Sequence, residues 1–77
     1  MSRGRAPVAF ARQVAIYLAH VALGLSYSAV ARSFRRDRTT VARACQVVED
    51  RRDDPRVDFL LSVLERILGG LAQRVRA

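Results

Sequence analysis

The residues of this chain that are best suited to bind a ligand stand together at positions 36–40, where the sequence reads Arg-Asp-Arg-Thr-Thr. Guanidinium groups and hydroxyls hydrogen-bond to phosphate oxygens and to the exposed edges of nucleic-acid bases. Asp37 is also a good N-cap, so the run predicts a helix that begins at Arg38 and exposes a polar first turn. Such a helix start contributes little to a core. It is suited to the major groove of duplex DNA, because its dipole favours nearby phosphate.

The sequence holds no arrangement of residues that is typical of catalysis or of metal binding. His20 has no cysteine, acid or second histidine at a ligand spacing. The single cysteine, Cys45, lies at an apolar helix position, where a core residue is expected. The acids between Glu49 and Asp54 are interpreted as a solvated segment. The chain is therefore expected not to be an enzyme and to use no cofactor and no metal.

Positive charge is concentrated in the first part of the chain. The 77 residues carry fourteen arginines and seven acids, for a formal charge of +7. Residues 1–48 contain eight of the arginines and one acid, whereas residues 49–77 contain six arginines and six acids. This excess implies a polyanionic partner, either nucleic acid or an anionic membrane. The apolar stretch at 14–25 is too short to span a bilayer, and no signal peptide is evident, so a cytoplasmic, nucleoid-associated location is expected.

Apolar residues recur at helical spacing and no stretch favours a strand, which predicts an all-α fold of four helices. Gly69 and Gly70 are expected to end or kink the last helix. The expected helices cover residues 8–23, 27–34, 38–51 and 55–68, with N-caps at Ser26, Asp37 and Asp54. The expected organisation is a flexible basic arm (residues 1–7), a DNA-binding domain (residues 8–68) and a short tail (residues 69–77).

The second and third expected helices have the spacing of a helix-turn-helix. Val41 follows the small Ala31 by ten residues, and Ala44 comes three residues later. Two helices that cross at a steep angle need small and apolar residues at such offsets. Arg35 occupies the turn position that glycine usually takes. Because a left-handed backbone there costs a non-glycine residue about 1 kcal/mol, another turn shape is expected.

The exposed side of the third helix is expected to provide most contacts with DNA, since Thr39, Arg43 and Gln46 lie opposite the apolar stripe, flanked by Arg38, Thr40 and Ala42. Asp37 is interpreted either as a cap or as an acceptor from a cytosine amine. Arg3 and Arg5 are interpreted either as minor-groove side chains or as part of a loose tail. The residues expected to contact bases are Asp37, Arg38, Thr39 and Arg43. Those expected to contact the DNA backbone are Arg12, Gln13, Ser26, Tyr27, Ser28, Arg36, Thr40 and Gln46, of which Gln46 can also pair with adenine.

Three runs of the sequence together resemble a known family. They are residues 12–23, which begin Arg-Gln, residues 26–34, and the run Arg-Asp-Arg-Thr-Thr-Val at 36–41, which leads to Ala44-Cys45. With this pattern the chain resembles the C-terminal helix-turn-helix domain of the bacterial replication initiator DnaA, in which Arg-Asp-His-Thr-Thr-Val opens the recognition helix. The resemblance implies a fold of that Trp-repressor-like type, with double-stranded DNA as the partner. It also implies base or phosphate contacts from residues 37–40, a phosphate contact from Gln13, and minor-groove binding by the segment that holds Arg3 and Arg5.

Departures from the family's pattern bear on the target. Arg38 replaces the family's histidine, which is expected to change the base that is read, and Arg35 stands in a turn that looks one residue shorter. No ATPase module is evident, so an ATP-dependent initiator filament is not expected. The first interpretation is therefore a transcription regulator, such as an activator of a phage-derived or gene-transfer-agent cluster, which detached DnaA-like modules resemble. The alternative is a protein that binds initiator boxes and controls chromosome replication.

The last expected helix suggests a further kind of partner. Its apolar stripe runs from Leu60 to Leu68, and most of it is expected to cover the helix-turn-helix core. Any apolar surface left exposed can pair subunits or bind RNA polymerase or a sigma-factor-like protein. Membrane binding is not expected, because the arginines do not cluster on this helix. The sequence does not indicate which DNA site is bound, whether transcription is activated or repressed, or how many copies of the chain assemble.

Overall fold

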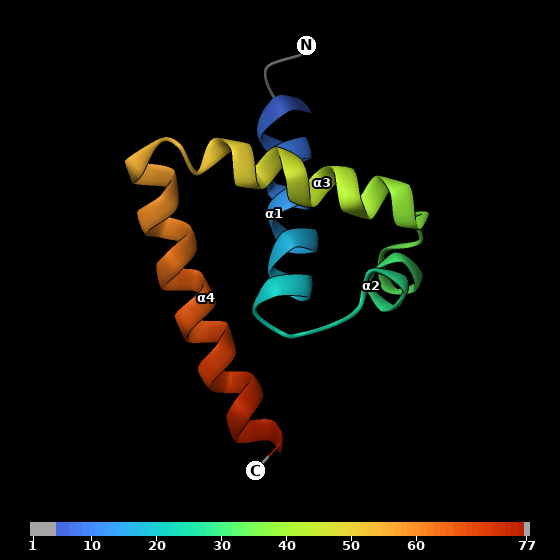
Figure 1. The fold of residues 1–77 in the computed structure, drawn as a ribbon, viewed down its shortest axis with the longest axis vertical. Coiled ribbons are helices and arrows are strands. Elements are labelled where there is room, and N and C mark those ends of the chain that lie inside the picture. Colours follow the sequence, from blue (N-terminus) through green and yellow to red (C-terminus); the bar gives the residue numbers. More distant parts are fainter. Residues whose placement is uncertain (1–4, 77) are drawn as a thin grey trace.

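The computed structural model describes residues 5–76, which form four α-helices and, within that range, no strand. The helices are α1 (Arg5–Val21), α2 (Tyr27–Phe34), α3 (Arg38–Arg51) and α4 (Pro55–Arg76). In Figure 1, α3 crosses α1, α2 lies at the N-terminal end of α3, and α4 runs beside α1 on the other side of the molecule. The expected all-α fold of four helices is confirmed.

Both helices of the helix-turn-helix begin and end where the sequence predicts, because their N-caps are made locally. The hydroxyl of Ser26 accepts a hydrogen bond from the backbone N–H of Ala29 at 3.1 Å. The carboxylate of Asp37 accepts one from the backbone N–H of Thr40 at 2.7 Å. Each bond satisfies an N–H that has no acceptor within its own helix. These caps fix where the exposed first turn of α3 starts.

The first helix is displaced from its expected position. It starts at Arg5 rather than at Val8, so part of the expected flexible arm is helical, and it ends at Val21 rather than at Leu23. Pro7 does not prevent the earlier start, since the N–H that proline lacks has no intrahelical acceptor in a first turn.

One core holds the first three helices together. The least exposed large side chains are Tyr17 and Ile16 from α1, Val30 from α2, and Val41 and Val48 from α3. The apolar stripe predicted for the third helix is buried in full, and Cys45 is confirmed as one of its core residues. Burial also raises the pKa of the Cys45 thiol, with a smaller effect from the Glu49 carboxylate. The core thus sets the side of α3 that faces outward.

The last helix differs most from expectation. Gly69 and Gly70 lie inside α4, which continues to Arg76, because glycine permits the left-handed turn that ends a helix but does not impose it. The expectation that most of the apolar stripe covers the core is wrong. Leu61 is buried, whereas Leu60 is 61% and Ile67 is 53% exposed. Helical spacing shows that a face is apolar but not what covers it.

The turn of the helix-turn-helix also differs from expectation. Arg35 adopts the left-handed conformation (φ 55°, ψ 46°), where another turn shape was expected for a residue with a side chain. In this turn the backbone N–H of Arg36 donates to the carbonyl of Ala31 at 3.0 Å, a hydrogen bond that closes the C-terminus of α2. Burial of Ala31 and Val41 on either side of the turn outweighs a cost of about 1 kcal/mol.

Replacing Arg35 by glycine is expected to stabilise the protein by about 0.5–1 kcal/mol. The substitution removes the left-handed strain, and the greater freedom of glycine in the unfolded chain offsets part of the gain. Arg32→Gly, at an exposed position inside α2, is the matched control and is expected to destabilise by about 1 kcal/mol. Urea unfolding measures both changes. A loss of stability in Arg35→Gly would contradict the strain assigned to this turn.

Candidate nucleic-acid interface

The start of α3 is built around the Asp37 carboxylate. It accepts a hydrogen bond from the backbone N–H of Thr40 at 2.7 Å, and this bond, helped by the nearby hydroxyl of Thr40 and backbone N–H of Thr39, lowers the pKa of Asp37. The carboxylate is therefore ionised near neutral pH and is occupied with the helix start. Of the two interpretations of Asp37, capping is the one that the geometry shows.

The outward side of α3 carries the polar side chains expected there. Arg38, Thr39, Thr40 and Arg43 are all exposed, with Thr39 and Arg43 opposite the buried stripe and Arg38 and Thr40 on its flanks. Gln46 is also exposed, and its Nε2 donates to Oδ1 of Asp50 at 3.1 Å. That bond is between two exposed groups, so it can be exchanged for a DNA contact at small cost. The face has no large apolar side chain and projects from a rigid helix.

A hollow beside this face brings together residues that lie far apart in the sequence. It has a volume of about 380 Å³ and lies between α1 and the first turns of α3. Among its lining residues are three arginines, one amide and one hydroxyl, from Arg12, Gln13, Arg36, Thr40 and Arg43. All five were expected from the sequence to contact DNA. Within residues 8–75, whose side chains the structure describes, no acid forms an ion pair with any of these arginines. Their donors are therefore available for an anionic ligand.

Other expected contact residues do not line this hollow. Ser26 caps α2, Ser28 is half-buried, and Tyr27 lies against the ring of His20 with 4.4 Å between the ring centroids. His20 thus packs against Tyr27, and its Nδ1 lies 2.7 Å from the carbonyl oxygen of Leu25. Of the expected minor-groove side chains, Arg3 lies outside the described residues, and Arg5 is described only as the first residue of α1.

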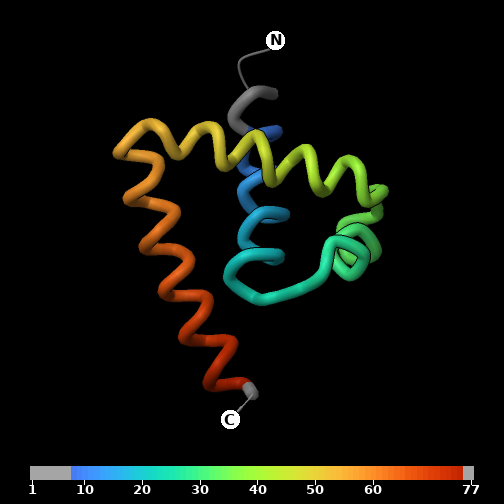
Figure 2. Tube along the Cα trace, in the orientation of Figure 1, coloured from blue at the N-terminus to red at the C-terminus, as the bar shows by residue number. Residues whose placement is uncertain are grey.

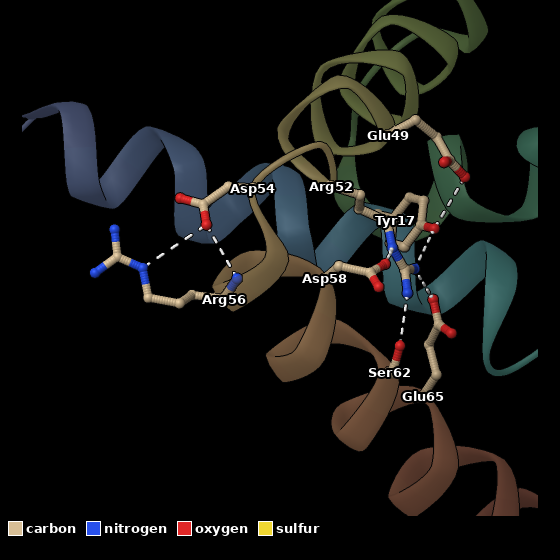
Figure 3. A network of polar contacts seen from close by, with 8 residues as sticks. All are labelled: Tyr17, Glu49, Arg52, Asp54, Arg56, Asp58, Ser62 and Glu65. Carbon is tan, nitrogen blue, oxygen red and sulfur yellow. Dashed lines mark hydrogen bonds and ion pairs between the residues drawn. The ribbon is translucent and has the colours of Figure 1, made fainter.

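A second polar cluster, which the sequence analysis missed, ties α4 to the rest of the fold (Figure 3). Its centre is Arg52, whose side chain is 17% exposed. The guanidinium donates to Asp58 Oδ1 at 2.6 Å, to Glu65 Oε2 at 2.5 Å and to Ser62 Oγ at 2.9 Å, all on α4. It also donates to the hydroxyl of Tyr17 on α1 at 2.8 Å, and that hydroxyl donates to Oε2 of Glu49 on α3 at 2.9 Å. Glu49 is exposed, as expected of a solvated acidic segment, and it also takes part in this cluster by accepting from Tyr17.

The spacing of the polar residues on α4 contained a signal for this cluster. Asp58, Ser62 and Glu65 stand at i, i+4 and i+7, which places them on one side of a helix. Two carboxylates and a hydroxyl on one side of a helix, next to its apolar stripe, can bind a cationic side chain from another part of the fold. Nothing in the local sequence, however, distinguishes Arg52 from its exposed neighbour Arg51.

The cluster makes stability depend on alkaline pH. Burial is the main reason that the pKa of Tyr17 is raised from 10.0 to about 12. The nearby Arg52 lowers this pKa, and Glu49 raises it. Because the folded pKa lies above the unfolded value, this contribution is fully present below pH 10 and is lost as the pH rises to about 12. We expect the free energy of unfolding to fall over that interval, measured by denaturant unfolding at each pH. Tyr17→Phe is expected to show a smaller fall, and an identical fall would contradict the assignment.

The capped α3, its polar outward face and the arginine-lined hollow define a helix-turn-helix DNA-binding domain. A family model described as the bacterial DnaA protein helix-turn-helix matches residues 1–48, more than half of the chain. The chain belongs to this family, and it is a DNA-binding protein.

The match covers α1, α2 and most of α3, which is also the part of the chain that holds the excess positive charge. The comparison finds a DNA-binding domain and no catalytic one. No curated protein and no solved structure matches the chain. None of the helices in the described part of the chain has the length and apolar character needed to span a membrane.

Proposed function

We propose that the chain reads specific sequences of duplex DNA by inserting the start of α3 into the major groove. Arg38 and Arg43 are suited to donate to O6 and N7 of guanine, and Thr39 to contact a thymine methyl group. Each good bidentate contact contributes about 1–3 kcal/mol of discrimination between bases. Asp37 contributes chiefly by fixing the orientation of the first turn, since its carboxylate is held by the backbone of α3.

The observation that carries this proposal is the arginine-lined hollow next to the base-reading face. A helix in the major groove is flanked by phosphates, and the protein must bind them to hold the helix in register. Arg12 and Gln13 from α1 and Arg36 from the turn provide donors on the flank of α3. Base readers and phosphate binders therefore adjoin on one side of the fold. The backbone contacts expected of Ser26, Tyr27, Ser28 and Gln46 stay predictions.

For the biological role, we propose regulation of transcription. A sequence-specific DNA reader with an exposed apolar surface on a separate helix has the two surfaces that a regulator uses, one for DNA and one for protein. The second candidate is binding of the replication initiator's box, which membership of the DnaA helix-turn-helix family favours. Arg38 distinguishes the two, because the family's histidine at this position presents different donors to the base.

In vitro selection of bound duplexes from a random pool, followed by sequencing, tests the proposal and separates the two roles. The proposal expects one enriched motif that differs from the initiator box at the base pair facing Arg38. Enrichment of the initiator box itself would favour the second candidate. Arg38→Ala is expected to relax discrimination at one position, whereas Arg12→Ala is expected to weaken binding to all sequences alike. Selection of no motif would overturn sequence-specific reading.

A further inference from the structure

We propose that the exposed apolar face of α4 pairs with the same face of a second copy of this chain, as two antiparallel helices. The face is defined by Leu60, Leu64, Ile67 and Leu71, which we name the α4 seam. These four side chains are between 38% and 61% exposed.

The spacing within the α4 seam is that of a helix pair rather than of a helix lying on a core. Its four residues follow one another at intervals of four, three and four. This heptad pattern aligns apolar side chains along a narrow stripe, which interlocks with the matching stripe of another helix. The residues that face α1 form a separate row, since Leu61 is buried and Leu68 packs against the core. The helix thus has two apolar rows, of which the fold covers one.

The fold leaves the seam accessible. The hydrogen bonds of Arg52 and the packing of Leu61 hold one side of α4 to the body of the protein. Figure 2 shows α4 along one edge of the molecule, with α2 and the start of α3 at the opposite edge. A partner on the seam would therefore leave the DNA-reading face free.

Charge along the chain sets the direction of pairing. The residues just before α4 include the exposed Asp53 and Asp54, while Asp58 is held by Arg52; residues 66–76, by contrast, contain three arginines and no acid. A parallel pair would place the arginine-rich ends side by side, and an antiparallel pair places each beside the acidic end of the other copy. Antiparallel helices also place the positive end of each helix dipole beside the negative end of the other. This complementarity of one copy for another is why we assign the seam to a second copy.

The antiparallel arrangement also gives a register. Leu60 of one copy lies against Leu71 of the other, and Leu64 lies against Ile67, so every seam residue has an apolar partner. In this register Arg74 of one copy lies near the start of α4 in the second copy, which follows Asp53 and Asp54. The paired segment, from Leu60 to Leu71, spans about 18 Å at a rise of about 1.5 Å per residue, so a reversible dimer is expected rather than a permanent one.

Sedimentation equilibrium of the 77-residue protein without DNA tests the pairing. With rising protein concentration, the mass is expected to approach twice the 8.6 kDa of one chain. Ile67→Glu is expected to keep it at 8.6 kDa with unchanged helical circular dichroism. Phe59→Glu is the matched control, because Phe59 is 68% exposed but lies roughly 100° round the helix from the seam, so dimerisation is expected to persist. If the wild-type protein stays monomeric at the concentrations used for NMR spectroscopy, the proposal is overturned. It is also overturned if Ile67→Glu and Phe59→Glu change the measured mass equally.

Disulfide cross-linking tests the direction. In an equal mixture of Leu60→Cys and Leu71→Cys proteins, the antiparallel register predicts a cross-link between the two variants. A cross-link of Leu60→Cys with itself would overturn that register.

The link to DNA rests on the proposed function. Two copies joined through α4 present two recognition helices, so the selected motif is expected to contain two related half-sites. Ile67→Glu is then expected to bind a duplex with one half-site as tightly as the wild type does. Unlike the wild type, it is expected to gain no affinity when the duplex has two half-sites. Because mass is measured without DNA, failure of the dimer and failure of DNA reading give separate results.

Discussion

Replacing Arg12, Arg36 and Arg43 together by alanine is expected to weaken binding of duplex DNA by roughly 100-fold at physiological salt, or about 2.7 kcal/mol. The three guanidiniums line one hollow beside the recognition helix and form no ion pair within the described part of the chain. In DNA-bound protein Arg12 and Arg36 are each expected to neutralise one phosphate and so to release condensed counterions, whereas Arg43 is expected to bind guanine. With about six phosphates contacted, wild-type affinity is expected to fall about 10³-fold between roughly 50 and 200 mM salt. With about two of the six phosphate contacts removed, the triple variant is expected to show about two thirds of that slope on a logarithmic plot.

A matched variant controls for net charge. Arg56, Arg66 and Arg74 are exposed on α4, away from the hollow, and replacing them by alanine removes the same number of charges. On a duplex with one half-site this control is expected to lose less than fivefold in affinity and little of the salt slope, because distant exposed charges are screened. Fluorescence anisotropy at several salt concentrations measures both. Equal losses in the two variants would show that DNA responds to net charge and not to this hollow.

Replacing Arg52 by alanine is expected to destabilise the protein by about 2 kcal/mol. The mostly buried guanidinium donates to Tyr17 and to three side chains of α4, and its removal leaves part-buried oxygens without a partner. The half-exposed Asp58 recovers water, which limits the loss. For a domain of this size the expected fall in Tm is roughly 8–16 °C. Hydrogen exchange is expected to rise most along α4, where few other contacts replace the cluster.

The control for this prediction is Arg56→Ala. Arg56 forms an ion pair with Asp54 at 3.7 Å, but its side chain is 93% exposed, so its removal is expected to change stability by less than about 0.5 kcal/mol. Thermal unfolding of the two variants compares the loss of a mostly buried guanidinium with the loss of an exposed one four residues away. A Tm for Arg52→Ala that matches that of Arg56→Ala would contradict the role given to the cluster.

The sequence predicted the helix-turn-helix well because its determinants are local. Ser26 and Asp37 cap the helices that follow them, and the buried stripe of α3 repeats at the helical period. The proposed contact surface followed from the same pattern, since Thr39, Arg43 and Gln46 lie opposite that stripe on a helix. The charge difference between the two parts of the chain indicated an anionic partner. The hollow between α1 and α3 then brought together five residues that the sequence could only name separately.

The features that could not be predicted depend on contacts distant in sequence. The shape of the turn at Arg35 is set by the helices packed on both sides of it, which outweigh the local preference of the residue. Arg52 contacts residues up to 35 positions away, and its neighbours in the sequence are equally charged. The apolar stripe of α4 was evident, but only the position of that helix shows which part of it lies free.

The most direct test of the central claim is chemical-shift mapping of the isotope-labelled protein with a selected duplex. If α3 enters the major groove by its first turns, the largest shift changes and the intermolecular contacts are expected at residues 36–46, with a second group at Arg12 and Gln13. Perturbations confined to α4, with none near Thr39 and Thr40, would contradict the claim.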